Sequence, residues 1–191
     1  MNLAKIEQEV HPLEICYRVL FYEETASTRQ EAARLAAGPD WEDTLIIADH
    51  QTAGKGTHGR PWFDSPGDSI LVSLLLHPRP GLRTLPLSRL TAEALADGIQ
   101  AHTGVRCTLR EPNDVLIGGK KVAGVLAETS CGGNAPAYWI LSFGLNVHVE
   151  EFPSDLAATA CSLHECSPRP PEREALLIEI LRNLDERLQE E

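Results

Sequence analysis

Residues 51–62 read Gln51-Thr-Ala-Gly-Lys-Gly-Thr-His-Gly-Arg-Pro-Trp62. Glycines at positions 54, 56 and 59 alternate with residues whose side chains donate hydrogen bonds. Glycine accepts positive φ angles and allows close backbone approach, so successive N–H groups can turn toward one anion and form a nest. Lys55 and Arg60 add cationic donors, and Trp62 offers a flat apolar face to a heterocycle. The stretch therefore predicts a loop that binds an anion and a ring system.

Taken alone, this loop also fits a flexible surface segment with incidental charges, because short glycine motifs often arise by chance. It lacks the Gly-Lys-Ser/Thr ending of a Walker loop, and its glycine spacing differs from that of a dinucleotide-binding fingerprint. Its interpretation therefore depends on the rest of the chain.

The hydrophobic pattern on both sides of the loop predicts alternating strands and helices. Ser27 or Thr28 can cap the first helix, and Gly118-Gly119 is typical of a hairpin turn. We expect an α+β fold in which helices pack on a mixed, largely antiparallel sheet. The expected strands are 44–49, 69–76, 105–109, 115–117, 120–128 and 137–147, the expected helices are 30–37, 87–102 and 176–188, and loops are expected at 50–67, 131–136 and 168–171.

Composition limits the classes of function. The net charge of −11 argues against a nucleic-acid or anionic-membrane partner, because such partners need a basic face. Five cysteines, an odd number without a signal peptide, favour reduced thiols in the cytoplasm. The longest apolar stretch, Ile70–Leu76, is too short to span a bilayer.

A second segment combines a turn with a lysine. Pro112-Asn113-Asp114 precedes the predicted hairpin, and Lys121 follows Asp114 by seven residues. A lysine in this position can bridge a carboxylate and an α-phosphate and neutralise the charge that forms during phosphoryl chemistry. Without the loop at 51–62, the same residues fit an ordinary turn and solvated charges on an edge strand.

Together the two segments resemble the catalytic domain of biotin protein ligases. That family has Gln-Thr-x-Gly-Arg-Gly-Arg-x-Gly-Arg-x-Trp in the loop and Lys-Trp-Pro-Asn-Asp…Lys-x-Ala-Gly-Ile-Leu-x-Glu in the second segment. Three further motifs occur in the family's order: Ser27-Thr28-Arg29 for Ser-Thr-Asn, Gly144-Leu145-Asn146-Val147 for Gly-Ile-Asn-Val, and Ala160-Cys161-Ser162-Leu163 for Ala-Thr-Ser-Leu.

The resemblance implies a fold like that of class II aminoacyl-tRNA synthetases and a two-step reaction. Biotin and MgATP give biotinyl-5′-AMP, and a lysine of a biotin carboxyl carrier protein then takes the biotinyl group. The protein alone supplies no metal site, and Mg²⁺ enters with ATP near Asp114. The implied catalytic residues are Lys121, Lys55 and Arg60; the biotin contacts are Ser27, Thr28, Arg29, Gln51, Gly54, Lys55, Gly56, Thr57, Lys121 and Gly124; the nucleotide contacts are Arg60, Trp62, Asn113, Asp114 and Asn146.

Departures from the family pattern keep two alternatives open. Thr57, Glu111 and Arg29 replace the usual Arg, Trp and Asn, which favours a degenerate domain that binds biotin or its adenylate without transfer. Arg110 also replaces a lysine. A lipoate or octanoate transferase is the other alternative, although the Arg-Arg-x-Gly-Gly-Gly pattern of lipoate ligases is absent.

The domain limits are further expectations. Residues 1–15 show little pattern and are expected to be a frayed leader, and residues 16–191 are expected to form the catalytic domain. We expect neither the N-terminal DNA-binding domain nor the C-terminal barrel that some family members carry. The sequence leaves open whether the protein forms a homodimer.

Overall fold

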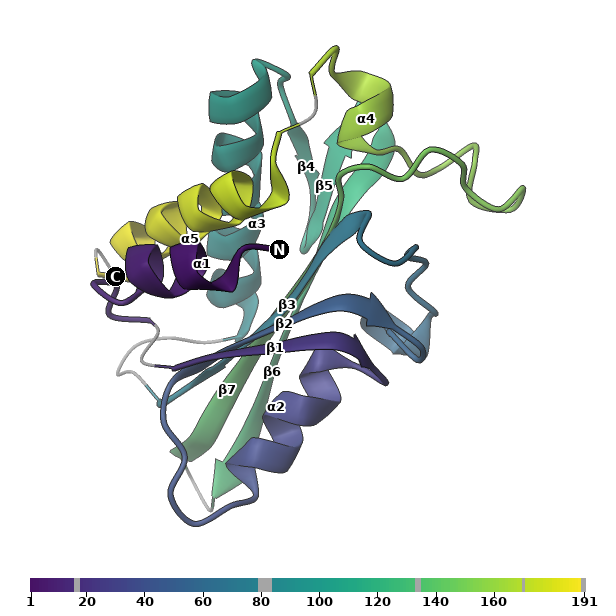
Figure 1. Ribbon diagram of the computed structural model, residues 1–191. Coiled ribbons are helices and arrows are strands. Elements are labelled where there is room, and N and C mark those ends of the chain that lie inside the picture. The colour runs from purple at the N-terminus through teal and green to yellow at the C-terminus, as the bar shows by residue number, and fades with distance from the viewer. Residues whose placement is uncertain (16–17, 79–83, 133–134, 170, 190–191) are drawn as a thin grey trace.

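A computed structural model describes residues 1–15, 18–78, 84–132, 135–169 and 171–189 (Figure 1). Cys16 lies outside the described residues. Gly133, Asn134 and Pro170, which belong to predicted loops, also lie outside them.

A seven-stranded mixed sheet forms the centre of the fold, in the order β1-β2-β3-β7-β6-β5-β4. Only β1 and β2 pair in parallel; the other described pairs are antiparallel. The predicted α+β fold with a largely antiparallel sheet is confirmed. The strands are β1 (Arg18–Thr25), β2 (Thr44–Gln51), β3 (Ser69–Leu76), β4 (Thr108–Arg110), β5 (Asp114–Ile117), β6 (Lys120–Gly132) and β7 (Ala135–Asn146).

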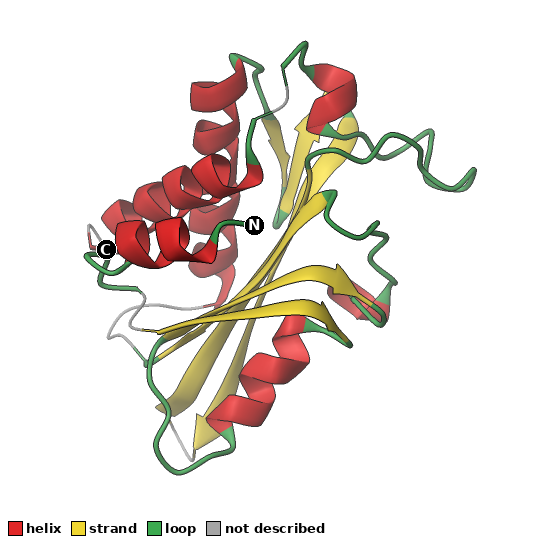
Figure 2. Cartoon of the chain, viewed as in Figure 1, coloured by secondary structure: helices red, strands yellow, loops and turns green. Residues whose placement is uncertain are grey.

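Helices cover the two faces of the sheet unequally (Figures 1 and 2). Helices α1 (Leu3–Val10), α3 (Thr84–Thr103) and α5 (Arg173–Gln189) lie on one face, and α2 (Thr28–Ala36) lies on the other. A short 3-10 turn, η1 (Thr57–Gly59), and α4 (Leu163–Cys166) lie in the connections. No described helix is long and apolar enough to cross a membrane.

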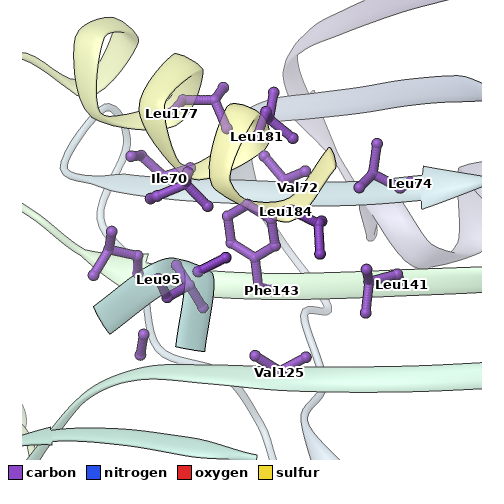
Figure 3. Close-up of a cluster of buried hydrophobic side chains, with 14 of the residues drawn as sticks. Ile70, Val72, Leu74, Leu95, Val125, Leu141, Phe143, Leu177, Leu181 and Leu184 are labelled. Atoms are coloured by element: carbon purple, nitrogen blue, oxygen red, sulfur yellow. The ribbon is translucent and has the colours of Figure 1, made fainter. Parts of the chain in front are cut away.

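The main core fills the space under α3 and α5 (Figure 3). Ile70, Val72 and Leu74 alternate along β3, so their side chains all point to this face. They pack with apolar residues of β6, β7, α3 and α5, namely Val125, Leu141, Phe143, Leu95, Leu177, Leu181 and Leu184.

The opposite face has a smaller core, and this leaves room for a site. Leu75 of β3 and Ile140 of β7 pack with Ala32 of α2. Farther along the same face, Ser73 and Gly144 replace large apolar residues. Helix α2 therefore covers one end of this face, while small side chains form the floor of the other end.

The expectation of a frayed leader is wrong for the first helix. Asn2 caps α1 by accepting a hydrogen bond from the Lys5 amide at 3.2 Å. Ile6 and Val10, four residues apart, lie on one side of the helix and are buried in the main core. The Ile15 amide donates to Asp185 of α5 at 3.1 Å. Two apolar positions were too few to reveal this helix in the sequence.

Several predicted boundaries also differ. The strand predicted at 105–109 is Thr108–Arg110, and the strand predicted at 120–128 continues to Gly132. Consequently much of the loop predicted at 131–136 is strand, because β6 and β7 remain paired as far as Gly132 and Ala135. Cross-strand pairing extends these strands, and one strand's own pattern does not contain that information.

Truncation of Ile6 tests whether α1 belongs to the fold. Ile6 is fully buried, so Ile6→Ala should lower the free energy of unfolding by about 2–4 kcal/mol. Glu7→Ala, at an exposed neighbour in the same helix, should change it by less than about 0.5 kcal/mol. Urea denaturation followed by circular dichroism measures both, and equal stability of the two variants would show that α1 contributes nothing.

Candidate active site

The loop from Gln51 to Trp62 folds back on itself as a small hairpin. The Trp62 amide donates to the Gly54 carbonyl at 2.9 Å, and the Gly56 amide donates to the Arg60 carbonyl at 2.8 Å. His58 and Gly59 form the tip with φ angles of 57° and 71°. The predicted anion nest is therefore wrong for Gly56, because its N–H is used inside the hairpin.

Buried groups hold both ends of this hairpin. The Asp64 carboxylate accepts from the Gln51 amide at 3.2 Å and contacts the His50 ring at 2.9 Å. At the other end, the Trp62 indole lies on the backbone of β6 and β7. A Cβ atom on Gly144 would lie 2.6 Å from the indole, and one on Gly124 would lie 3.3 Å from it. Gly144 is therefore needed for the indole to approach the sheet, and a side chain at Gly124 would crowd it.

A narrow cavity of about 50 Å³ lies on the same face of the sheet as α2, at the end that this helix does not cover. Leu126 shares this face and lines the cavity, whereas Val72, Val125 and Phe143, whose side chains lie in the main core, border it from the strands of the sheet. Nine of the ten residues predicted to contact biotin line it, namely Ser27, Thr28, Arg29, Gln51, Lys55, Gly56, Thr57, Lys121 and Gly124. Gly54 is the exception, since it lies behind the Gln51 side chain and accepts the hydrogen bond from Trp62.

A wide cavity of about 370 Å³ lies beside the narrow one. Four of the five residues predicted to contact the nucleotide line it: Arg60, Trp62, Asp114 and Asn146. The two cavities share a wall, which consists of Gly56, Thr57, Trp62 and Lys121. A ligand that extends from one cavity into the other must therefore pass Lys121.

Asn113 lies apart from the other residues predicted to bind the nucleotide. It lines the narrow cavity, and its Nδ2 donates to the Val125 carbonyl at 2.6 Å. The Val125 amide in turn donates to the Asn113 carbonyl at 2.9 Å. These two bonds fix the start of β5 against β6, so we assign Asn113 to the architecture of the narrow cavity.

The sequence interpretation missed several lining residues. Phe63, Phe152 and Leu156 form an apolar part of the wide cavity, and Phe63 packs against Phe152 at 5.9 Å between ring centroids. Ser142 lines the narrow cavity from β7. The available signal was a serine within the apolar strand 137–147, whereas Phe152 and Leu156 come from a connection without any pattern.

Lys121 is held between an acid and an aromatic ring. Its Nζ lies 2.6 Å from Asp114 Oδ1 and 5.5 Å from the centroid of Trp62. Arg110 contacts the other carboxylate oxygen of Asp114 at 2.6 Å. Burial alone would raise the pKa of Asp114, but the hydrogen bonds from Lys121 and Arg110 outweigh burial and lower it below its ordinary value of 3.8.

Three of the residues that depart from the family pattern are engaged in ion pairs, and one of them is Arg110, which pairs with Asp114. Arg29 pairs with Glu128 at 3.3 Å at the edge of the narrow cavity. Glu111 lines neither cavity, and its carboxylate lies 4.0 Å from Arg89. The anion of Glu111 is therefore directed away from the two cavities, whereas Thr57 lies in the wall between them.

Comparisons with known proteins identify the family of the chain. The model of the biotin/lipoate A/B protein ligase family matches residues 24–146, more than half of the chain. A bifunctional ligase/repressor BirA of Bacillus spizizenii is 36% identical over 172 residues, which cover 88% of this chain and 53% of that protein. A biotin–[acetyl-CoA-carboxylase] ligase of Mycobacterium tuberculosis is 33% identical over 181 residues, covering 86% of this chain and 62% of that protein.

Solved structures give the same result for the fold. A biotin protein ligase from Aquifex aeolicus, solved in complex with biotin and ATP, superposes with a TM-score of 0.80 and 28% identity. The match covers 91% of this chain and 71% of that one. The chain thus belongs to the biotin/lipoate A/B protein ligase family, and it spans about half the length of the Bacillus relatives.

The lowered pKa of Asp114 predicts how its ion pairs respond to acid. The pairs stabilise the fold fully above the ordinary carboxyl pKa of 3.8, and the stabilisation is lost as the pH falls through the lower pKa of the folded state. The difference in unfolding free energy between the wild type and Asp114→Asn should therefore stay constant from about pH 7 to pH 5 and shrink below pH 3.8. Denaturant titrations at each pH measure it, and a difference that grows in acid would contradict the assignment.

Proposed function

We propose that this chain activates biotin with ATP to form biotinyl-5′-AMP and transfers the biotinyl group to a lysine of a biotin carboxyl carrier protein. The observation that carries the proposal is the position of Lys121 in the wall between the two cavities. A ligand carboxylate that leaves the narrow cavity and a phosphate in the wide cavity both meet its ammonium group. This is the geometry that joining a carboxylate to an α-phosphate requires.

The linings of the two cavities support the assignment of each reactant. The narrow cavity combines the apolar side chains of Leu126 and Trp62 with polar groups from Ser27, Thr28 and Gln51, which suits a compact ring with hydrogen-bonding atoms on an aliphatic chain. The wide cavity has aromatic walls from Trp62, Phe63 and Phe152 for a base, with Arg60 available for phosphate.

The chemistry follows from charge and proximity. The biotin carboxylate attacks the α-phosphorus, the bond to the bridging oxygen breaks, and pyrophosphate leaves. Lys121, Lys55 and Arg60 stabilise the negative charge on the phosphoryl oxygens. Holding both reactants at one wall also converts a bimolecular step into an intramolecular one. In the second step the acceptor lysine attacks the mixed anhydride and AMP leaves.

The residues around Asp114 do not fit a magnesium site held by the protein. Both carboxylate oxygens of Asp114 already contact cations, Lys121 and Arg110. Within the described ranges, no group of three or more His, Cys, Asp or Glu side chains can hold a metal ion. We therefore propose that Mg²⁺ enters as part of MgATP and is bound by its phosphates.

Two alternatives receive less support. A lipoate or octanoate transferase needs an apolar end for a hydrocarbon chain, but the polar residues Thr28, Gln51 and Ser142 line the narrow cavity. A degenerate domain was favoured partly by Glu111, whose carboxylate is directed toward Arg89. Thr57 is the departure that still favours it, because this side chain lies between the two cavities.

One assay compares the three functions. The protein is incubated with ATP, Mg²⁺ and either biotin or lipoate, with and without a carrier domain. Biotin-dependent pyrophosphate release together with a labelled carrier supports the ligase. Biotin binding by calorimetry without turnover supports the degenerate domain, and a preference for lipoate contradicts the proposal.

Lys121 and its neighbour Lys120 offer a matched pair of variants. Lys121→Ala should reduce biotin-dependent pyrophosphate release by at least about a hundredfold, because the phosphoryl charge loses a preorganised partner. Lys120 points to Glu165 at 3.3 Å and lines neither cavity, so Lys120→Ala should retain the wild-type rate. Pyrophosphate release measures both, and circular dichroism confirms the fold. Wild-type rates in Lys121→Ala would show that this lysine is not catalytic.

A further inference from the structure

Four side chains beneath the narrow cavity form one continuous chain of hydrogen bonds. Ser73 Oγ lies 2.8 Å from Ser142 Oγ and 2.8 Å from Thr28 Oγ1, and Thr28 Oγ1 lies 3.1 Å from Gln51 Oε1. Ser73 and Ser142 are direct cross-strand partners on β3 and β7. They share the face that bears the small side chains, so the chain runs across the floor of the cavity.

The backbone fixes the direction of every proton in this chain. The Thr28 amide donates to Gln51 at 2.8 Å, so the accepting atom must be the amide oxygen rather than the NH₂ group. The Thr28 hydroxyl also contacts this oxygen and has to donate its only proton there. Ser73 must then donate to Thr28, and Ser142 must donate to Ser73.

The end of the chain therefore has a defined polarity. Ser142 lines the narrow cavity, yet its single proton is already given to Ser73. Its oxygen faces a ligand only as an acceptor. Gln51 has the opposite polarity: its Nε2 has no hydrogen-bond partner among the described residues and remains a donor. The cavity thus fits a ligand that carries an N–H beside a carbonyl oxygen.

We infer that Ser142 is a specificity-determining residue that accepts a hydrogen bond from a ring N–H of the ligand, and that Ser73 is the positioning residue that keeps Ser142 an acceptor. This inference rests on the proposed function, in which the ligand is biotin with its cyclic urea. A ligand with a ring oxygen in place of that N–H would bring two acceptors together, and it should be rejected because neither atom carries a proton.

The test measures the binding of biotin and two analogues to the full chain by calorimetry. Each analogue is a cyclic carbamate in which a ring oxygen replaces one of the two ureido N–H groups. The wild type should bind at least one analogue about tenfold or more weaker than biotin, since an unsatisfied acceptor replaces a hydrogen bond. The readout is the ratio of the affinity for biotin to the affinity for the more weakly bound analogue, because a general structural defect lowers both affinities together.

Variants of the serines separate the two roles. Ser142→Ala removes the acceptor, so the ratio should fall toward one, with biotin binding about three- to tenfold weaker. Ser73→Ala frees the proton of Ser142 to turn toward a ring oxygen, so the ratio should also fall. Ser69→Ala is the matched control: Ser69 is buried on the same face of β3, lines neither cavity, and should leave the ratio at its wild-type value.

The outcomes distinguish this inference from the proposed function. If biotin binds and supports pyrophosphate release while both Ser142→Ala and Ser73→Ala retain the wild-type ratio, the inference fails alone. If the wild type does not bind biotin, both it and the proposed function fail. Thermal melting checks each fold, and Ser142→Ala by itself decides the question if Ser73→Ala does not fold.

Discussion

The contact of the Trp62 indole with two paired strands is the constraint on which the whole site depends. The register of β6 and β7 places Gly124 opposite Gly144, and the absence of side chains at both lets the ring lie on the backbone. This contact anchors one end of the hairpin that begins at Gln51. Gly56 and Thr57 then lie between the two cavities, and Lys121 has an aromatic neighbour. A single packing contact therefore links the sheet, the loop and the reactive lysine.

The charges at the site oppose the charge of the whole molecule. The chain carries a net charge of −11, yet Arg29, Lys55, Arg60, Arg110 and Lys121 all line the cavities. Asp114 is the only carboxylate among the described lining residues, and two of these cations already pair with it. An anionic ligand is thus attracted locally even though the protein as a whole repels anions.

Sequence patterns predicted the loop at 50–67 and every strand except β1 better than they predicted details that depend on contacts. The apolar run at residues 69–76 was enough to predict β3, whereas α1 was not predicted because only Ile6 and Val10 mark its buried side. Gly56 seemed available to bind an anion, but its amide bonds to Arg60 across the hairpin. Ser142 had no visible role until strand register placed it beside Ser73.

The sequence by itself determined the kind of protein, because motifs in a fixed order contain most of the residues that line the two cavities, and apolar runs predicted most of the sheet. Tertiary structure alone decided how these residues divide between two cavities, since that division depends on strand register and on where the Trp62 ring lies. It also decided the proton direction that ends at Ser142. The donor and acceptor roles are set by hydrogen bonds that connect Gln51 through Thr28 and Ser73 to Ser142. These residues are far apart in the sequence, so no local sequence pattern predicts the roles.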